Sequence, residues 1–230
     1  MTALRTIPIL PLVLTLVAFY IGSLCQKKFR LSVFNPILIG AILVIAVMKL
    51  IGLSDSDYQW GMKNLSWLLT PATISLAIPM YEQFQILKKN LTAVLVAVAA
   101  GVVSCLSVLL LCSLLLGFGR NLTVSLLPKG ITTAIGVSLT EMLEGTPSIT
   151  TFGILITGIW GNMFGKQFFK WFGITDEIAQ GVAFGTGAHV IGTAKANEVS
   201  PLCGAVSSLS LVVAGLMTAL ILPVLVGLLL

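Results

Sequence analysis

Short polar breaks between long apolar runs are the feature that most constrains how this chain folds. The most polar break runs from Gly185 to Glu198 and contains the single histidine, three glycines, two threonines and a lysine. A charge at the centre of a bilayer costs about 2.5–3.5 kcal/mol on insertion scales, and glycine is about 1 kcal/mol worse than alanine in a helix. A simple membrane anchor has no need of such residues, so we expect this stretch to hold a small polar solute inside a membrane.

The shortage of charge decides the fold class. Only 9% of the 230 residues are charged and 57% are hydrophobic, whereas a soluble domain carries about 25% charged residues. We therefore predict an all-α polytopic membrane protein, because the apolar runs are far longer than the strands of roughly ten residues in membrane barrels. The net charge of +5 is typical of the positive-inside rule. No aromatic platform accompanies the basic run 27–30, which argues against nucleic-acid binding.

The apolar pattern predicts five long helices and three shorter, interrupted elements. The long helices are expected over residues 7–24, 36–53, 90–116, 147–172 and 201–229. The shorter elements are expected over 65–81, 123–143 and 178–197, and residues 54–61 are expected to form a loop. If the basic segments all face the cytoplasm, 123–143 must enter and leave on one side. We therefore expect seven spans and one re-entrant element.

The two halves of the chain resemble each other. Asn35-Pro36 begins one apolar helix and Thr146-Pro147 begins another. Short broken elements around Pro71 and Gly187 occupy corresponding positions, which is the pattern of transporters with a site at the interface of two repeats. We predict one membrane domain of two structurally similar repeats, 1–119 and 120–230, with broken or re-entrant helices.

Lys129 is the first candidate for a binding residue. Pro128 and Gly130 break the helix on either side of it, and Thr132 and Thr133 follow. A small carboxylate favours this set of a cation, free N–H groups at a helix start and short hydroxyl donors. The alternative is a lysine that extends its ammonium group to the membrane surface.

His189 is the second candidate. It titrates near neutral pH, which suits proton-coupled transport of an acid, but a neutral histidine bonded to a backbone carbonyl is the competing interpretation. Thr193 lies four residues later on the same helical face, and Gly192 permits a close backbone approach. Lys195 either joins the site or pairs with Glu198 three residues later.

Asn35 and Pro71, with Thr73, are the first-half counterparts of these breaks. Helix ends at these positions would direct their dipoles at a solute. Ordinary capping explains Asn35 equally well.

The sequence offers little support for metal binding, redox chemistry or enzymatic catalysis. The four cysteines, Cys25, Cys105, Cys112 and Cys203, stand singly in apolar surroundings and predict no metal or redox site. Neither a nucleophile elbow nor an H-E-x-x-H pattern occurs. We therefore predict no enzyme and no cofactor. The glycines of 147–172 favour close helix packing and suggest a homodimer.

The sequence resembles the LrgB/CidB family of bacterial membrane proteins, whose plant relative is a chloroplast glycolate/glycerate translocator. The resemblance covers nearly the whole chain and rests on a set of short motifs: Phe34-Asn35-Pro36, Pro71-Ala72-Thr73, Leu76 to Glu82, Leu127-Pro128-Lys129 with Thr132-Thr133, Gly145 to Ser148, Gly185 to Ala196, and Ser207-Ser208. Two positions depart from the family pattern. Ala134 stands where the family usually has proline, and Lys195 stands in place of arginine, which loses a bidentate fork.

The resemblance implies a protein of the bacterial cytoplasmic membrane and two descriptions of its role. One is a carrier of small monocarboxylates such as pyruvate or glycolate, which the residue pattern favours. The other is a holin-like modulator of autolysis and murein hydrolase activity that acts with a small LrgA/CidA-like partner. Holins are short chains with few spans, so the predicted duplication argues against a simple pore.

Overall fold

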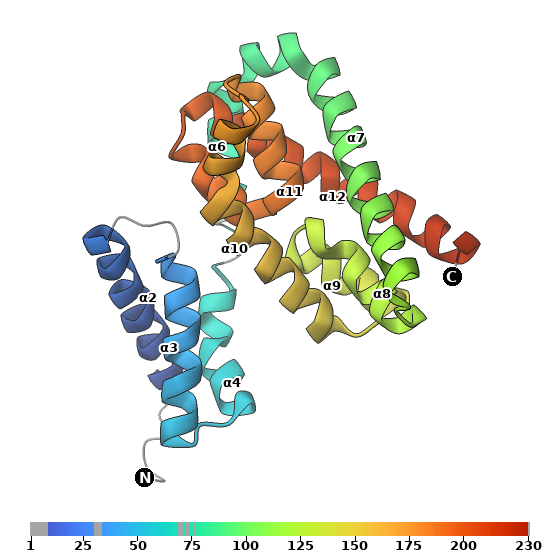
Figure 1. Ribbon diagram of the computed structural model, residues 1–230. Coiled ribbons are helices and arrows are strands. Elements are labelled where there is room, and N and C mark those ends of the chain that lie inside the picture. Colours follow the sequence, from blue (N-terminus) through green and yellow to red (C-terminus); the bar gives the residue numbers. More distant parts are fainter. Residues whose placement is uncertain (1–8, 30–33, 69–70, 72–73, 76, 230) are drawn as a thin grey trace. The chain divides into compact units, whose positions relative to one another are not determined.

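All regular secondary structure in the computed structural model is helical over the part of the chain that it describes, residues 9–29, 34–68, 71, 74–75 and 77–229 (Figure 1). The elements in chain order are α2 (Leu10–Phe29), α3 (Pro36–Ile51), α4 (Asp55–Ser66), α6 (Ala77–Glu82), α7 (Phe84–Leu116), α8 (Arg120–Leu126), η1 (Leu127–Gly130), α9 (Thr133–Met142), α10 (Pro147–Trp171), α11 (Glu177–Asn197) and α12 (Pro201–Leu229). The all-α prediction is confirmed.

Within the described part of the chain, three helices, α2, α7 and α12, are long and apolar enough to cross a membrane, and α3 is apolar but shorter. Large apolar side chains cover the outside of α7, including Leu114, Leu115 and Leu116. Such surfaces are unusual on a soluble protein and suit contact with lipid. The prediction of seven spans with one re-entrant element is not tested by these helices and stays a prediction.

The chain packs as two compact units, Met1–Ser75 and Leu76–Leu230. This division follows packing and not sequence repetition, so the repeats 1–119 and 120–230 stay a prediction. The first element of each predicted repeat has a different form. α2 is continuous, whereas residues 120–142 form two short helices with a turn between them.

One expectation for the smaller unit is wrong. Residues 54–61, predicted to be a loop, lie at the start of α4. Ser54 caps this helix by accepting a hydrogen bond from the amide of Asp57 over 3.2 Å. Asp55 and Asp57 in the first turn are also favourable at the positive end of the helix dipole. The polar composition that suggested a loop is therefore the composition of a helix start.

The core of the larger unit lies between α7 and α12. The inward face of α7 consists of residues four apart, and the facing side chains come from α12: Val94, Val98, Val102 and Leu106, with Ala205, Ala214, Leu222 and Val226. This apolar core is the scaffold on which the remaining elements of the unit are placed.

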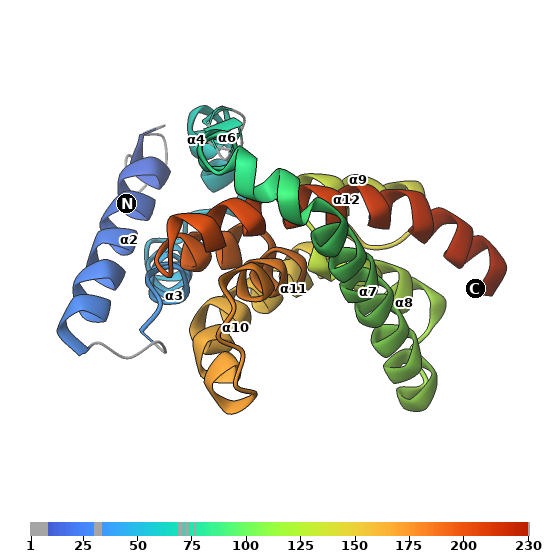
Figure 2. The same ribbon diagram turned by 90° about the horizontal axis from the view of Figure 1, so that it is seen from above.

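α10 and α11 lie side by side (Figure 2). Glycines of α10 stand where the two helices come closest. A Cβ atom on Gly161 would lie 2.2 Å from the Cβ of Ala188, and one on Gly158 would lie 2.7 Å from Cε1 of His189. The glycines that suggested a homodimer are thus occupied by packing inside the unit. The homodimer stays a prediction, but these glycines do not support it.

Candidate functional site

Residues 120–146 fold into a helical hairpin, named hairpin 1, in which η1 joins α8 to α9. The two ends of the hairpin are held together by Asn121, whose side chain donates to the carbonyl of Glu144 over 3.2 Å and accepts from Oγ1 of Thr146 over 2.8 Å. The predicted break at Pro128-Lys129-Gly130 is confirmed and forms the tip. The chain leaves hairpin 1 beside the point where it entered, which is the shape that a re-entrant segment needs.

Buried hydroxyl groups fix hairpin 1 to α10. Thr150 Oγ1 donates to the carbonyl of Ser125 over 2.8 Å and lies 2.7 Å from Oγ1 of Thr140. The amide of Thr146 donates to Oγ of Ser125 over 2.7 Å. Buried polar groups are stable only when they are bonded in this way, and these bonds join α8, α9 and α10 into one body.

Thr132 and Thr133 stand at the start of α9, directly after the tip of hairpin 1. Thr132 is the N-cap residue, but its side chain makes no capping bond. It is half-buried, and Thr133 is exposed. The first amide groups of a helix have no partner within the helix and carry the positive end of its dipole. Two hydroxyls and a positive helix end therefore lie a few residues from Lys129.

α11 is two half-helices folded back on each other, named hairpin 2 (residues 177–200). His189 has φ 42° and ψ −136°, outside the helical region, and marks the break. Beyond it the chain reverses. The reversal brings Gly192 back to Phe184, so that a Cβ on Gly192 would lie 2.7 Å from the carbonyl oxygen of Phe184. At the other end Ser200 donates to the carboxylate of Glu177 over 2.7 Å. The predicted polar break in 178–197 is confirmed.

His189 lies at the tip of hairpin 2 and is only 3% exposed. Its Nε2 lies 2.8 Å from the carbonyl oxygen of Ile154, in the N-terminal half of α10. A carbonyl can only accept, so Nε2 carries the proton and donates it. The carbonyl of His189 accepts from Oγ1 of Thr193 over 2.9 Å. This arrangement matches the interpretation of a histidine bonded to a backbone carbonyl.

The tips of the two hairpins meet. A Cβ on Gly130 of hairpin 1 would lie 3.5 Å from the carbonyl oxygen of Thr186 in hairpin 2. Beside this junction lies a cavity of about 540 Å³, lined by Lys129, by Gly187 and Ala188, and by Thr157 and aromatic residues of α10. His189 is not among the described residues that line it, because its ring is directed at Ile154.

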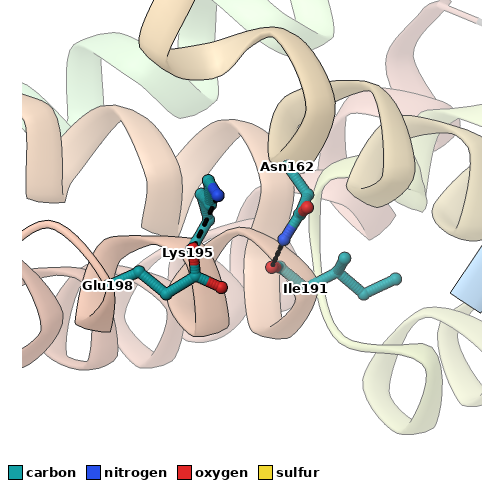
Figure 3. A network of polar contacts seen from close by, with 4 residues as sticks. All are labelled: Asn162, Ile191, Lys195 and Glu198. Carbon is teal, nitrogen blue, oxygen red and sulfur yellow. Dashed lines mark hydrogen bonds and ion pairs between the residues drawn. The ribbon is translucent and has the colours of Figure 1, made fainter. Parts of the chain in front are cut away.

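The remaining candidates of hairpin 2 are engaged in local contacts. Gly192 is packed against Phe184, and Thr193 Oγ1 lies 2.8 Å from Oγ of Ser207 on α12. Lys195 forms an ion pair of 2.6 Å with Glu198, close to the bond of 3.0 Å from Asn162 Nδ2 to the carbonyl of Ile191 (Figure 3). None of these three candidates is among the described residues that line the cavity of about 540 Å³.

Asn35 and Pro71 belong to the smaller unit. Asn35 is buried and caps α3, its Oδ1 accepting from the amide of Ile37 over 2.8 Å. Pro71 lies in helical backbone and is exposed. Thr73 lies outside the described residues.

The structure adds residues that the sequence analysis did not select. The lining of the cavity includes four residues of α10: Thr157, Trp160, Phe164 and Phe168. Their spacing of three or four residues places them on one helical face, which is the signal that would have identified them. The carbonyl of Ile154, the partner of His189, leaves no signal in the sequence, because every residue carries such a group.

The LrgB-like family profile matches residues 15–228 of this chain. The holin-like protein CidB of Staphylococcus epidermidis is 32% identical to it, with 95% of each chain covered. The uncharacterized protein YwbG of Bacillus subtilis is 33% identical, covering 96% of this chain and 98% of its own. The antiholin-like protein LrgB of Bacillus cereus is 31% identical, with 94% of each chain covered. No solved structure matches this chain.

These relatives are bacterial and include holin-like and antiholin-like proteins. Together with the apolar helices α2, α7 and α12, they identify a non-enzymatic bacterial membrane protein.

Proposed function

This chain belongs to the LrgB-like family, and we propose that it carries small monocarboxylates of the pyruvate and glycolate type across the bacterial cytoplasmic membrane, in connection with the control of autolysis. The observation that supports this function is the meeting of two hairpin tips beside a cavity of about 540 Å³ that Lys129 lines.

Lys129 is the anion-binding residue in this proposal. It is half-buried, and its stem packs on α10, where a Cβ on Gly153 would lie 3.5 Å from the Cβ of Lys129. Among the described residues that line the cavity, Lys129 is the one with a formal charge. A carboxylate that enters a mostly apolar cavity therefore gains a charge-assisted hydrogen bond from Lys129.

The start of α9 supplies further donors. Half-helices that end inside a membrane direct their positive N-terminal ends at anionic groups in transporters with broken helices. Thr132 and Thr133 stand at the start of α9, three and four residues after Lys129, but neither is among the described residues that line the cavity. The aromatic wall from α10 suits the small apolar part of a C2–C4 acid.

Proton coupling has less support than anion binding. His189 was the candidate for a proton-responsive residue, but its Nε2 already donates to Ile154. It acts in this proposal as a positioning residue that fixes hairpin 2 beside the cavity. Thr193 supports the same position through its bonds to His189 and Ser207.

A second function has support from the names of the relatives. The relatives are described as holin-like and antiholin-like, and these descriptions favour a holin-like modulator over a carrier; we propose murein hydrolase activity as what such a modulator would control. In this second proposal the chain acts through an LrgA/CidA-like membrane partner or as a homo-oligomer. The two functions are compatible if movement of an acid is the signal that sets autolysis.

Uptake of labelled pyruvate or glycolate into proteoliposomes tests the carrier. We expect the wild-type protein to accumulate label and Lys129→Ala to reduce the rate at least tenfold. Lys170→Ala is the matched control, because Lys170 is exposed in the last turn of α10 and is expected to retain uptake. Folded wild-type protein that takes up no C2–C4 monocarboxylate would overturn the carrier. Leakage of a large dye from the same vesicles would instead support pore formation.

A further inference from the structure

Hairpin 1 lies along the first turns of α10, with its open end at the start of that helix. In the first turn of α10, Thr150 donates to the carbonyl of Ser125 over 2.8 Å. One turn further along both chains, a Cβ on Gly153 would lie 3.5 Å from the Cβ of Lys129 at the tip. The first arm of hairpin 1 therefore runs alongside α10, from its start towards its interior.

Hairpin 2 lies along the rest of α10 and points the opposite way. A Cβ on Gly165 would lie 2.5 Å from Cε1 of Phe184, and one on Gly161 would lie 2.2 Å from the Cβ of Ala188. The residue numbers of these contacts rise in α11 as they fall in α10, until the tip of hairpin 2 reaches the carbonyl of Ile154. The open end of hairpin 2 therefore lies at the far end of α10.

The two tips meet end to end on α10, at Gly153 and Ile154 (Figure 1). The open ends are separated by a helix of 25 residues, which is about 37 Å long at a rise of about 1.5 Å per residue. The hydrocarbon core of a bilayer is about 30 Å thick. Non-helical backbone is tolerated at this depth where protein buries it, and Pro128 and His189 at the tips are buried. α10 is thus long enough to place one open end at each face of the membrane.

α10 is less apolar than α2, α7 and α12, and its contacts explain why. Its small and hydroxyl residues face the hairpins, as Gly161 and Thr150 do. Interfaces between membrane helices are enriched in residues of this kind. The large side chains that α10 exposes include Phe152 and Leu155, which suit contact with lipid. Its composition is therefore that of a helix that crosses a membrane with one face covered by protein.

Basic residues are concentrated on the side where hairpin 2 has its open end. α7 passes the tips at Gly101, where a Cβ would lie 3.3 Å from Oγ1 of Thr186, and its end leads through 117–119 to hairpin 1. The start of α7 therefore lies on the side of hairpin 2. Of the basic residues in 77–230 other than Lys129, the other side carries Arg120, and the side of hairpin 2 carries Lys88, Lys89, Lys166, Lys170 and Lys195. The positive-inside rule assigns the side of hairpin 2 to the cytoplasm.

We propose that both hairpins are re-entrant and enter the membrane from opposite faces, hairpin 2 from the cytoplasm and hairpin 1 from the outside. The element predicted over 178–197 then returns to its own side and does not cross. The cavity of about 540 Å³ lies on the cytoplasmic half of α10, because its lining extends along that helix from Ile156 to Phe169, with Lys129 at the inner end. Hairpin 1 separates Lys129 from the outside.

The role of this arrangement rests on the proposed function. In a carrier, the cavity admits an acid to Lys129 from the cytoplasmic half of the membrane, and hairpin 1 is the barrier on the outer side. Release to the outside then requires a hairpin to move relative to α10. Carriers built from broken helices expose a fixed site to the two faces in turn by movements of this kind.

Labelling of introduced cysteines in membrane vesicles tests the arrangement without any transport. Thr175→Cys lies in the turn before hairpin 2 and Glu141→Cys near the end of hairpin 1, and both positions are exposed. A membrane-impermeant thiol reagent is added to right-side-out and to inside-out vesicles, and mass spectrometry follows the peptide that carries each substitution. We expect Thr175→Cys to react at least tenfold faster in inside-out vesicles and Glu141→Cys at least tenfold faster in right-side-out vesicles. Equal reaction of both variants in detergent is the control for intrinsic reactivity.

Two results would overturn the proposal. One is reaction of both cysteines from the same face, which would mean that α10 does not cross between the two open ends. The other is reaction from opposite faces in the reverse order, which would place hairpin 2 on the outside. If the cysteines react from the expected faces and proteoliposomes take up no acid, the arrangement of the hairpins stands and the carrier function fails.

Discussion

Nε2 of His189 donates a hydrogen bond to the carbonyl oxygen of Ile154 over 2.8 Å, and this bond connects the tip of hairpin 2 to the N-terminal half of α10. The backbone of His189, with φ 42° and ψ −136°, is in a region that residues other than glycine rarely occupy. Such strain persists only where surrounding contacts impose it, and it is concentrated at functional sites. We therefore regard His189 as the residue that determines the shape of hairpin 2.

Two substitutions at His189 separate the hydrogen bond from the backbone strain. His189→Ala and His189→Gly both remove the bond to Ile154, but glycine also relieves the strained φ. We expect His189→Gly to be more stable than His189→Ala by about 1 kcal/mol in denaturant unfolding. In a regular helix the order is reversed, because alanine is favoured over glycine. The reversed order would therefore contradict a strained break at His189.

Gly161 tests the crossing of α10 and α11. The Cβ added by Gly161→Ala meets the Cβ of Ala188 at 2.2 Å, so one of the helices must shift. Overpacking of this kind costs about 1–3 kcal/mol, which denaturant unfolding would measure. Gly227→Ala is the control, because a Cβ there has no neighbour within 4 Å. An equal effect of the two substitutions would show that the helices do not meet at Gly161.

Thr150 tests the attachment of hairpin 1. Thr150→Val has nearly the same shape but leaves the carbonyl of Ser125 without its donor, which costs about 1–3 kcal/mol for a buried group. Thr151→Val removes a bond within one helix and should change stability by less than about 0.5 kcal/mol. Similar unfolding free energies for both variants would mean that hairpin 1 is not held by this network.

Substitution of Lys195 by alanine should affect the uptake of acid far less than substitution of Lys129. Lys195 is paired with Glu198 at 2.6 Å and lies at the end of α11, and such pairs contribute about 0–1 kcal/mol to stability. We expect Lys195→Ala to retain most of the uptake of labelled pyruvate that Lys129→Ala loses. If Lys195→Ala abolishes uptake in folded protein, the site extends to the end of hairpin 2.

The sequence predicts the elements of the larger unit closely, for identifiable reasons. Pro128 lacks an amide hydrogen and Gly130 disfavours a helix, so the tip of hairpin 1 is encoded locally. Thr146-Pro147 and Pro201 fix helix starts in the same local way. The apolar face of α7 follows from residues spaced four apart.

Tertiary contacts explain what the sequence does not predict. In hairpin 2 the break falls at His189 and not at one of its glycines, because the bond to Ile154 and the packing on Gly158 impose it. The sequence pattern predicts that broken segments of two repeats meet. The structure brings together two broken segments of the same unit, 120–146 and 177–200. Their meeting depends on the crossing of α10 and α11, for which the glycine pattern indicates close packing but not the partner.

The most direct test of a carboxylate site at the hairpin tips is whether an acid protects a cysteine, introduced into the cavity of about 540 Å³, from a thiol reagent. Gly187 lines the cavity, is exposed, and has no neighbour within 4 Å of an added Cβ, so Gly187→Cys should fold. Its rate of modification by a small thiol reagent is followed by mass spectrometry of the peptide that carries residue 187. The account predicts that pyruvate or glycolate slows this modification several-fold, and that the protection disappears when Lys129→Ala is added. Modification at the same rate with and without either acid, while Lys129 is intact, would contradict a carboxylate site between the hairpin tips.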